Sequence, residues 1–130
     1  MKSIAVLLSL LFSTAISAQV IYTPDYIHPT DLNENFKEVI FSDSLASSFF
    51  LILVKDVPMH KHLEHTEHIY VLGGTADMII GEDLISIAEH DILVIPKNTA
   101  HSVNITSRDP LKVISIQSPK FTGKDRIWLD

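Results

Sequence analysis

The sequence predicts an all-β domain, built as a sandwich or a barrel of short strands. Three observations lead to this fold class. Runs of about five to ten residues, rich in β-branched and aromatic side chains, recur between positions 36 and 117. Turn residues such as Gly, Pro, Asn and Asp separate these runs, and the runs show no helical period. Many short strands at regular spacing are typical of two packed sheets or a closed barrel.

The expected strands follow one another in a simple order. The first covers residues 36–41. The second lies within residues 48–57 and is apolar almost without interruption from Phe49 to Val54, as in a strand buried on both faces. Pro58 is expected to end this strand, and Gly81-Glu82-Asp83 predicts a tight hairpin between two later strands. The later strands are expected at 68–72, 75–80, 84–88, 92–95, 101–106 and 111–117.

The N-terminus has the pattern of a secretory signal peptide. Lys2 precedes an apolar run over residues 4–16, and small residues follow up to Ala18. The run is too short to span a membrane, although an uncleaved anchor or a buried N-terminal segment is the alternative. We therefore expect an exported protein, periplasmic or secreted, that begins at Gln19 after cleavage and does not stay on a membrane. The chain then divides into a signal peptide (1–18), a lead-in segment with the first strand (19–47), a barrel (48–117) and a C-terminal strap (118–130).

Charge and cysteine content exclude several classes of function. The formal net charge is −6, and removal of Lys2 with the signal peptide takes it to −7. An acidic chain without a Lys/Arg cluster is unsuited to nucleic acids and to anionic membranes. The chain has no cysteine, so it has no thiol nucleophile, and its stability must come from its core or from a bound metal.

The stretch from His60 to Gly74 holds four of the seven histidines and predicts a metal site. His60 and His62 are two residues apart, so on an extended strand they project from one face. Glu67 follows after a short loop, and His101 comes from a later strand. Three imidazoles and one carboxylate suit a divalent transition metal.

These residues resemble the two sequence motifs of the cupin family. The first motif is matched by His60-Lys61-His62, by Glu67 after four residues and by Gly74 after six more. The second is matched, after fifteen residues, by Pro96, Asn98, His101 and Asn104. The resemblance covers roughly residues 48–117 and implies a small jelly-roll barrel, the double-stranded β-helix. It also implies one bound ion of iron, manganese, nickel, copper or zinc, with the ligands His60, His62, Glu67 and His101.

The chain departs from the cupin motifs at three glycine positions. Val54, His90 and Asn98 stand where the family often has glycine. Asparagine tolerates a left-handed backbone conformation, so the turn at Asn98 is expected to survive. None of these positions is a proposed ligand, so the departures concern turn geometry rather than metal binding.

The remaining polar side chains near the motif have other expected roles. Glu64 and His65 lie in the loop between the ligands and are expected to face solvent, although either could replace Glu67 or support the ligands. His68 is adjacent to Glu67, so on a strand it should point to the opposite face. His90 is expected to cap a surface turn.

The barrel interior is expected to hold the substrate. Val103, in phase with His101, should face inward, whereas Tyr70 should lie opposite Glu67. Further interior candidates, with core packing as their default role, are Phe50, Ile52, Met59, Met78, Ile80 and Ile114. The C-terminal tail is expected to pack as a strap across the sheet; in an alternative, it gates the barrel mouth and Arg126 holds an anionic ligand.

The resemblance implies a metal-dependent enzyme acting on a small organic substrate, of dioxygenase, isomerase or lyase type. The sequence assigns no catalytic residue beyond the ligands and no organic cofactor; Tyr70, Glu64 and His65 are the nearest candidates for a base. The alternatives are a non-catalytic protein that binds a metal or a small ligand, and a metal that only staples the barrel. A homodimer formed at a sheet edge by the apolar run 49–54 is also expected.

Overall fold

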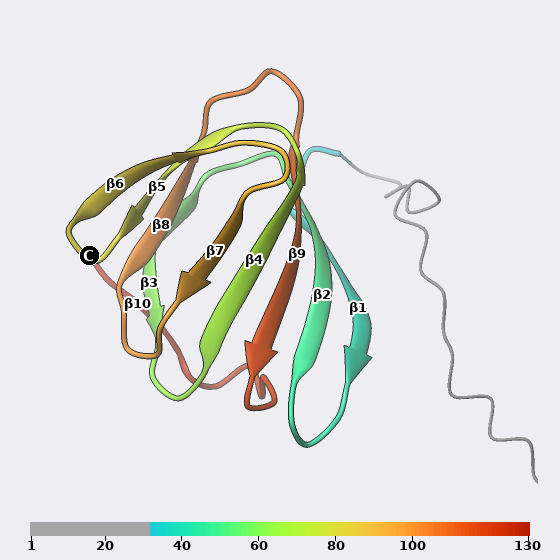
Figure 1. Cartoon of the computed structure of the whole chain (residues 1–130), viewed down its shortest axis with the longest axis vertical. Coiled ribbons are helices and arrows are strands. Elements are labelled where there is room, and N and C mark those ends of the chain that lie inside the picture. The colour runs from blue at the N-terminus through green and yellow to red at the C-terminus, as the bar shows by residue number, and fades with distance from the viewer. Residues whose placement is uncertain (1–31) are drawn as a thin grey trace, which may run out of the picture.

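Ten short strands form two antiparallel sheets of five strands each in the computed structural model of the chain, which describes residues 32–130 (Figure 1). The predicted signal peptide and positions 19–31 of the lead-in segment lie outside the described residues. The first sheet has the order β1 (Phe36–Ser42), β2 (Ser47–Leu53), β9 (Leu111–Ser118), β4 (Thr66–Gly73) and β7 (Ile92–Ile95). The second has the order β10 (Arg126–Trp128), β3 (Val57–His62), β8 (His101–Ile105), β5 (Ala76–Ile80) and β6 (Asp83–Ile87).

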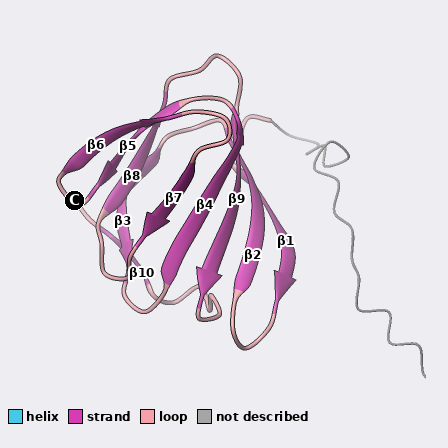
Figure 2. Cartoon of the chain, viewed as in Figure 1, coloured by secondary structure: helices cyan, strands magenta, loops and turns pink. Residues whose placement is uncertain are grey.

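The predicted all-β class is confirmed, because all regular structure between residues 32 and 130 is strand (Figure 2). In this described part of the chain, no helix is long and apolar enough to cross a membrane. The strands predicted after the first two correspond closely to β4, β5, β6, β7, β8 and β9. Their positions follow from runs of β-branched and aromatic residues bounded by turn residues.

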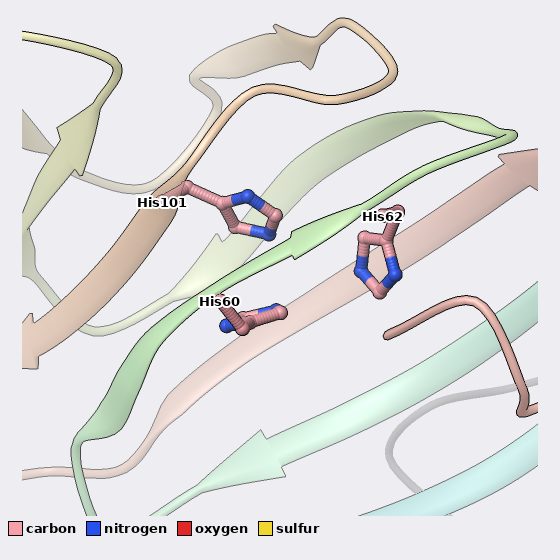
Figure 3. A group of neighbouring side chains, drawn as sticks. All are labelled: His60, His62 and His101. Carbon is pink, nitrogen blue, oxygen red and sulfur yellow. The ribbon is translucent and has the colours of Figure 1, made fainter. Parts of the chain in front are cut away.

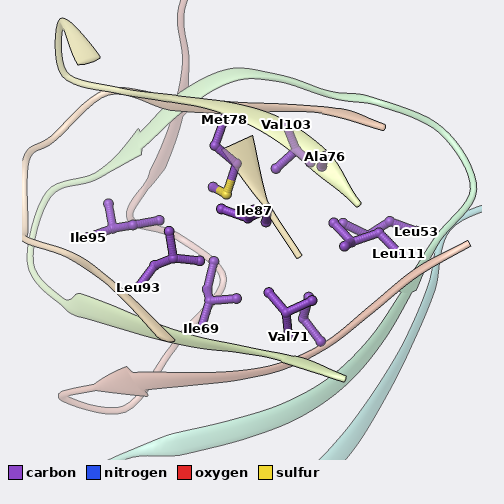
Figure 4. Packing of buried hydrophobic residues seen from close by; sticks show 11 residues of the cluster. Leu53, Ile69, Val71, Ala76, Met78, Ile87, Leu93, Ile95, Val103 and Leu111 are labelled. Carbon is purple, nitrogen blue, oxygen red and sulfur yellow. The ribbon is translucent and has the colours of Figure 1, made fainter. Parts of the chain in front are cut away.

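The hydrophobic core lies between the two sheets and is formed by inward-facing aliphatic side chains (Figure 4). On β9, buried and more exposed residues alternate, as expected of a strand with one face on the core. Met78 and Val103 belong to this core, as predicted, and Ile80 packs against it. The cluster consists of Leu53, Ile69, Val71, Ala76, Met78, Ile87, Leu93, Ile95, Val103, Leu111 and Val113.

Strand β2 is buried on both faces, as its apolar run predicts. It lies between β1 and β9, so this run is not itself a sheet edge, and the expected homodimer stays a prediction. The prediction that Phe50 and Ile52 face the barrel interior is wrong. Leu51 and Leu53 line the internal cavity, so Phe50 and Ile52 point to the other face of the sheet.

Two further interior candidates lie elsewhere. Ile114 lines a groove together with His68, Tyr70 and Ile116, side chains that alternate with the core residues of β4 and β9. Met59 precedes the buried His60 on β3 and is therefore turned to the opposite face.

Left-handed backbone conformations occur at three positions that the sequence singles out, Gly81, His90 and Asn98. The β5–β6 hairpin is tight, as predicted, and its loop has two residues, since Ile80 pairs with Asp83 and Gly81 has φ = 64°. Asn98 has φ = 62°, which confirms the expectation for that turn. His90 adopts φ = 77°, an unfavourable value for a residue with a side chain.

Strand β3 corrects the prediction for Pro58, which lies inside this strand instead of ending β2. The ladder between β3 and β8 is irregular between Val57 and His60, and such an irregularity accommodates a residue that cannot donate a backbone hydrogen bond.

The C-terminal strap also differs from the prediction. Its residues 126–128 do not cross a sheet face but form β10, which pairs antiparallel with the edge of β3. The pairs are Arg126 with His62, Ile127 with Lys61 and Trp128 with His60. The strap therefore lies directly beside the two histidines of the first motif.

Candidate metal centre

The two sheets together place the four predicted ligands in one cluster. His60 and His62 lie on the same face of β3, with the less buried Lys61 between them, and His101 on β8 pairs with His60. Nitrogen atoms of the three histidines lie within 4.8 Å of one another. Figure 3 shows the three rings around one space. Glu67 comes from β4 in the opposite sheet.

The carboxylate of Glu67 completes this cluster. Its Oε2 lies 3.7 Å from His62 Nε2 and 3.6 Å from His101 Nε2. All four side chains are buried, with relative exposures of 2% to 6%. Burying a polar or charged side chain costs free energy unless the side chain is hydrogen-bonded or paired, so these four groups require partners.

Backbone carbonyls orient two of the three rings. His60 Nδ1 lies 2.9 Å from the carbonyl oxygen of Pro58, and His101 Nδ1 lies 2.9 Å from that of Thr99. A carbonyl only accepts, so both rings carry their proton on Nδ1 and present an unprotonated Nε2. This is the arrangement that second partners impose on metal-binding histidines.

The ring nitrogens that point into the cluster fit a metal. His101 Nε2 and both ring nitrogens of His62 are buried and have no hydrogen-bond partner. A buried polar atom without a partner is costly in free energy. Coordination to a cation would satisfy these atoms, and nitrogen and carboxylate donors suit a divalent transition metal.

Two residues of β9 that the sequence analysis missed hold Glu67. Ser115 Oγ donates a hydrogen bond to Glu67 Oε1, and Gln117 Nε2 donates to the same oxygen at 3.1 Å. Burial by itself would raise the pKa of Glu67, but interactions with His101, Ser115 and Gln117 outweigh it and lower the pKa to about 2. Ser115 and Gln117 point inward from β9, whose other inward-facing residues are apolar. Two polar residues at inward positions of an apolar strand are the sequence signal that could have identified them.

His60 and His62 are neutral at ordinary pH. Burial, which disfavours the charged form, lowers the pKa of His60 and that of His62 to about 4. At pH 7 the cluster therefore combines these two neutral imidazoles with an ionised Glu67. These are the protonation states that metal coordination requires.

His65 is not exposed, contrary to the prediction. Its side chain is 2% exposed, and its Nδ1 lies 2.6 Å from Oδ2 of Asp125 in the strap. Burial lowers the pKa of this ring. Glu64 is exposed, as expected, and so is His68 on the outer face of β4.

His90 lies in the predicted surface turn. Its Nδ1 is 3.1 Å from the hydroxyl oxygen of Tyr70, and Tyr70 points away from Glu67, as its position along the strand predicts. Neither residue is part of the cluster.

A cavity of about 300 Å³ adjoins the cluster. His60, Glu67 and His101 form part of its wall, and aliphatic side chains from both sheets form most of the rest. The volume is at the lower end of the range for ligand pockets, about 300–1,000 Å³, so it suits a small molecule.

Two cations line the same cavity. Lys37 Nζ lies 5.4 Å from the ring centre of Phe121, and Arg126 Cζ lies 5.8 Å from it. Lys37 also lies over Phe49, and Arg126 over Trp128. Within residues 32–130 neither cation forms an ion pair; the one lysine that does is Lys55, with Glu34. An acidic protein therefore presents two positive side chains at this cavity.

Comparison with solved structures supports the fold. An uncharacterized conserved protein with a double-stranded beta-helix domain from Klebsiella pneumoniae superposes with a TM-score of 0.71, over 87% of this chain and 98% of that one, at 14% identity. KdgF from Halomonas sp. superposes with a TM-score of 0.69, over 81% of this chain and 97% of that one, at 17% identity. At these identities the likeness establishes the double-stranded β-helix fold alone.

Sequence comparison identifies the family. The chain is 41% identical to mannose-1-phosphate guanylyltransferase RfbM of Salmonella typhimurium over 69 residues, which are 53% of this chain but 14% of that enzyme. The corresponding enzyme of Salmonella muenchen is 38% identical over 66 residues, again 14% of its length. The chain thus matches only a small part of these enzymes. The family model described as mannose-6-phosphate isomerase C-terminal matches residues 52–129, more than half of the chain, and the chain belongs to this family of cupin-type domains.

Proposed function

We propose that this protein is a metal-dependent enzyme that acts on a small organic anion. The observation that carries the proposal is the convergence of three buried imidazoles and an ionised carboxylate beside a cavity. Its one metal ion, a divalent transition metal such as iron, manganese, nickel, copper or zinc, would be held by His60, His62, Glu67 and His101.

The chain's own residues shape the reaction site. A bound ion of this kind supplies Lewis acidity toward a carbonyl or hydroxyl oxygen. Glu67 balances its charge, and the aliphatic wall excludes water, which strengthens electrostatic interactions in the cavity. The isomerase in the family's description supports isomerase- or lyase-type chemistry, whereas bound iron together with oxygen uptake would indicate a dioxygenase.

The charge of the substrate follows from the two cations at the cavity. Lys37 and Arg126 approach the same ring, Phe121, without a carboxylate partner in the described residues. Both side chains line the cavity, so an anion bound there would be attracted by two positive charges. A small molecule with a carboxylate or phosphate group would therefore meet the metal with its reacting end and the cations with its charged end.

Metal analysis tests the centre. Elemental mass spectrometry of the purified native protein should give about one equivalent of one transition metal per chain. His101→Ala should abolish metal binding, because it removes the ligand that β8 contributes. His68→Ala is the matched control: it removes an exposed histidine next to Glu67 that faces the other way, and it should leave the metal content unchanged. A wild-type protein that binds no metal, even after reconstitution, would overturn the proposal.

Ligand binding tests the charge of the substrate. The metal-loaded protein is titrated with hexose phosphates, hexuronates and the corresponding neutral hexoses. Arg126→Ala should weaken binding of the anions by about tenfold, as expected for a partly desolvated charge contact, and leave the neutral sugars unaffected. Lys124→Ala, an exposed cation of the same strap outside the cavity lining, serves as the control. Equal affinities of wild type and Arg126→Ala for every anion would exclude this role.

We also propose that the protein works outside the cytoplasm. The support is the pattern of residues 1–18, in which a short positive region precedes an apolar run and small residues. N-terminal sequencing of the protein from the periplasmic or secreted fraction should find Gln19 first, and retention of Met1 in a cytoplasmic fraction would contradict export.

A further inference from the structure

His62 differs from the other two histidines of the centre in how its ring is held. Backbone carbonyls fix Nδ1 of His60 and of His101, but neither ring nitrogen of His62 has a hydrogen-bond partner. Its Nε2 faces Glu67, and its Nδ1 is not held by a backbone carbonyl as in the other two rings.

A carboxylate close to that nitrogen comes from the strap. Asp125 Oδ1 lies 3.9 Å from His62 Nδ1, about 0.7 Å beyond the upper end of the hydrogen-bond range, and this oxygen also has no partner. A small rotation of either side chain would close the gap.

Several contacts hold Asp125 in this place. Its Oδ2 lies 2.6 Å from His65 Nδ1 and 3.4 Å from the backbone N–H of Glu64. Its carbonyl oxygen accepts a hydrogen bond from the backbone N–H of Leu63 at 3.2 Å. The pairing of β10 with β3 begins at the next residue. These contacts hold the carboxylate through Oδ2 and the backbone, and Oδ1 remains directed toward His62.

We propose that Asp125 is the positioning residue for the metal ligand His62. Its carboxylate accepts the Nδ1–H of His62, keeps the proton off Nε2 and orients Nε2 toward the metal, while His65 holds the carboxylate. This inference rests on the proposed metal centre. It gives the strap a role in that centre. Asp125, 63 positions after His62, would accept the Nδ1 hydrogen bond of His62, as the carbonyls of Pro58 and Thr99 do for the other two rings.

The same three side chains could be taken for a second metal site, since their donor atoms lie within 4.8 Å of one another. The contact between His65 and Asp125 favours a hydrogen bond instead. Neighbouring ligands on a metal with bonds of about 2.1 Å are separated by about 3.0 to 3.4 Å, whereas these two atoms are 2.6 Å apart.

Cobalt binding tests the proposal. The full-length native protein is stripped with a chelator and titrated with Co²⁺, which reports both affinity and, through its absorption spectrum, the ligand field. Asp125→Ala should weaken Co²⁺ binding by about 10- to 100-fold and change the spectrum. Asp125→Asn should fall between, because one amide oxygen cannot serve two histidines. His65→Ala should weaken binding less, and the double variant should bind no worse than Asp125→Ala alone.

A matched variant separates positioning from simple docking of the strap. Phe121→Leu removes the edge contacts of Phe121 with the His62 and His65 rings but keeps the carboxylate. It should lower the unfolding temperature of the metal-free protein and leave Co²⁺ affinity within about twofold of wild type, because no metal ligand loses a hydrogen bond.

Four outcomes would overturn the proposal. The first is Co²⁺ affinity in Asp125→Ala within about twofold of wild type, and the second is equal losses in Asp125→Ala and Phe121→Leu with unchanged spectra. The third is two cobalt ions in wild type and one in Asp125→Ala, which would make the cluster a second metal site. A wild-type protein that binds no cobalt is distinct from these, because it removes the metal centre itself and the proposal with it.

Discussion

Ser115 is the residue whose substitution tests the electrostatics of the centre most directly. It is fully buried, and its hydroxyl donates to the same oxygen of Glu67 as the amide of Gln117. Ser115→Ala removes this donor without adding volume. The variant leaves an ionised, buried carboxylate with one side-chain donor on that oxygen where wild type has two.

The expected cost follows from the strength of a hydrogen bond to a charged group, about 1.5–3 kcal/mol. The same free energy corresponds to about one to two pKa units, so the pKa of Glu67 should rise from about 2 to between about 3 and 4. A depressed carboxyl pKa contributes stability that is present above the unfolded value of 4.5 and is lost as the pH falls toward 2. The cost of the substitution is therefore fully expressed at pH 7.

Urea denaturation of the metal-free protein at pH 7 measures this cost, in wild type and in a Glu67→Gln background. Without the charge, the hydroxyl makes an ordinary hydrogen bond worth about 1 kcal/mol, so Ser115→Ala should cost clearly less there. A cost below about 0.5 kcal/mol at pH 7, or the same cost in both backgrounds, would refute the reasoning.

Three further predictions concern stability. Lowering the pH from 6.5 to 4 should destabilise the metal-free protein by about 3 kcal/mol in urea titrations, because unfolded His60 and His62 take up protons that the folded rings, with pKa values of about 4, largely do not. The unscreened shifts would give about 5 kcal/mol over this range, which solvent screening roughly halves, and a flat profile would contradict the prediction. His90→Gly should raise stability by up to about 1 kcal/mol in thermal denaturation, since φ is 77° and glycine adopts this conformation freely, even after the ring's exposed hydrogen bond is lost; a lower unfolding temperature would contradict it. Gly74→Ala should cost about 3 kcal/mol and Gly123→Ala about 1 kcal/mol, because both have positive φ but only the first Cβ would lie 2.7 Å from a backbone oxygen; equal costs would contradict the clash.

Much of the fold and the position of the four predicted ligands follow from local sequence patterns. Turn residues and β-branched runs predict most strand positions. The spacing of His60 and His62 predicts their common face, since side chains alternate along a strand. Asn98 adopts the left-handed conformation that its side chain permits.

The errors arise where local patterns carry no information. Both faces of β2 are apolar, so alternation could not decide between Leu51 and Phe50 as a wall of the cavity. His65 lies in a short loop between motif residues, a position typical of solvent exposure. It is buried because Asp125 reaches it from the C-terminal strap, and a contact between residues 60 positions apart leaves no periodic signal in the sequence.

Because the candidate ligands come from opposite walls of the barrel, a metal bound by all four would be sensitive to the spacing of those walls. The three histidines belong to the second sheet, and Glu67 belongs to the first. If a ligand in the cavity changed the spacing of the sheets, it would also change the distance across which the four side chains hold an ion, and occupancy of the cavity and affinity for the metal would be linked. Thermodynamic reciprocity then requires that the factor by which substrate alters metal affinity equal the factor by which metal alters substrate affinity. The width of the cavity and the affinity for the ion would thus be coupled.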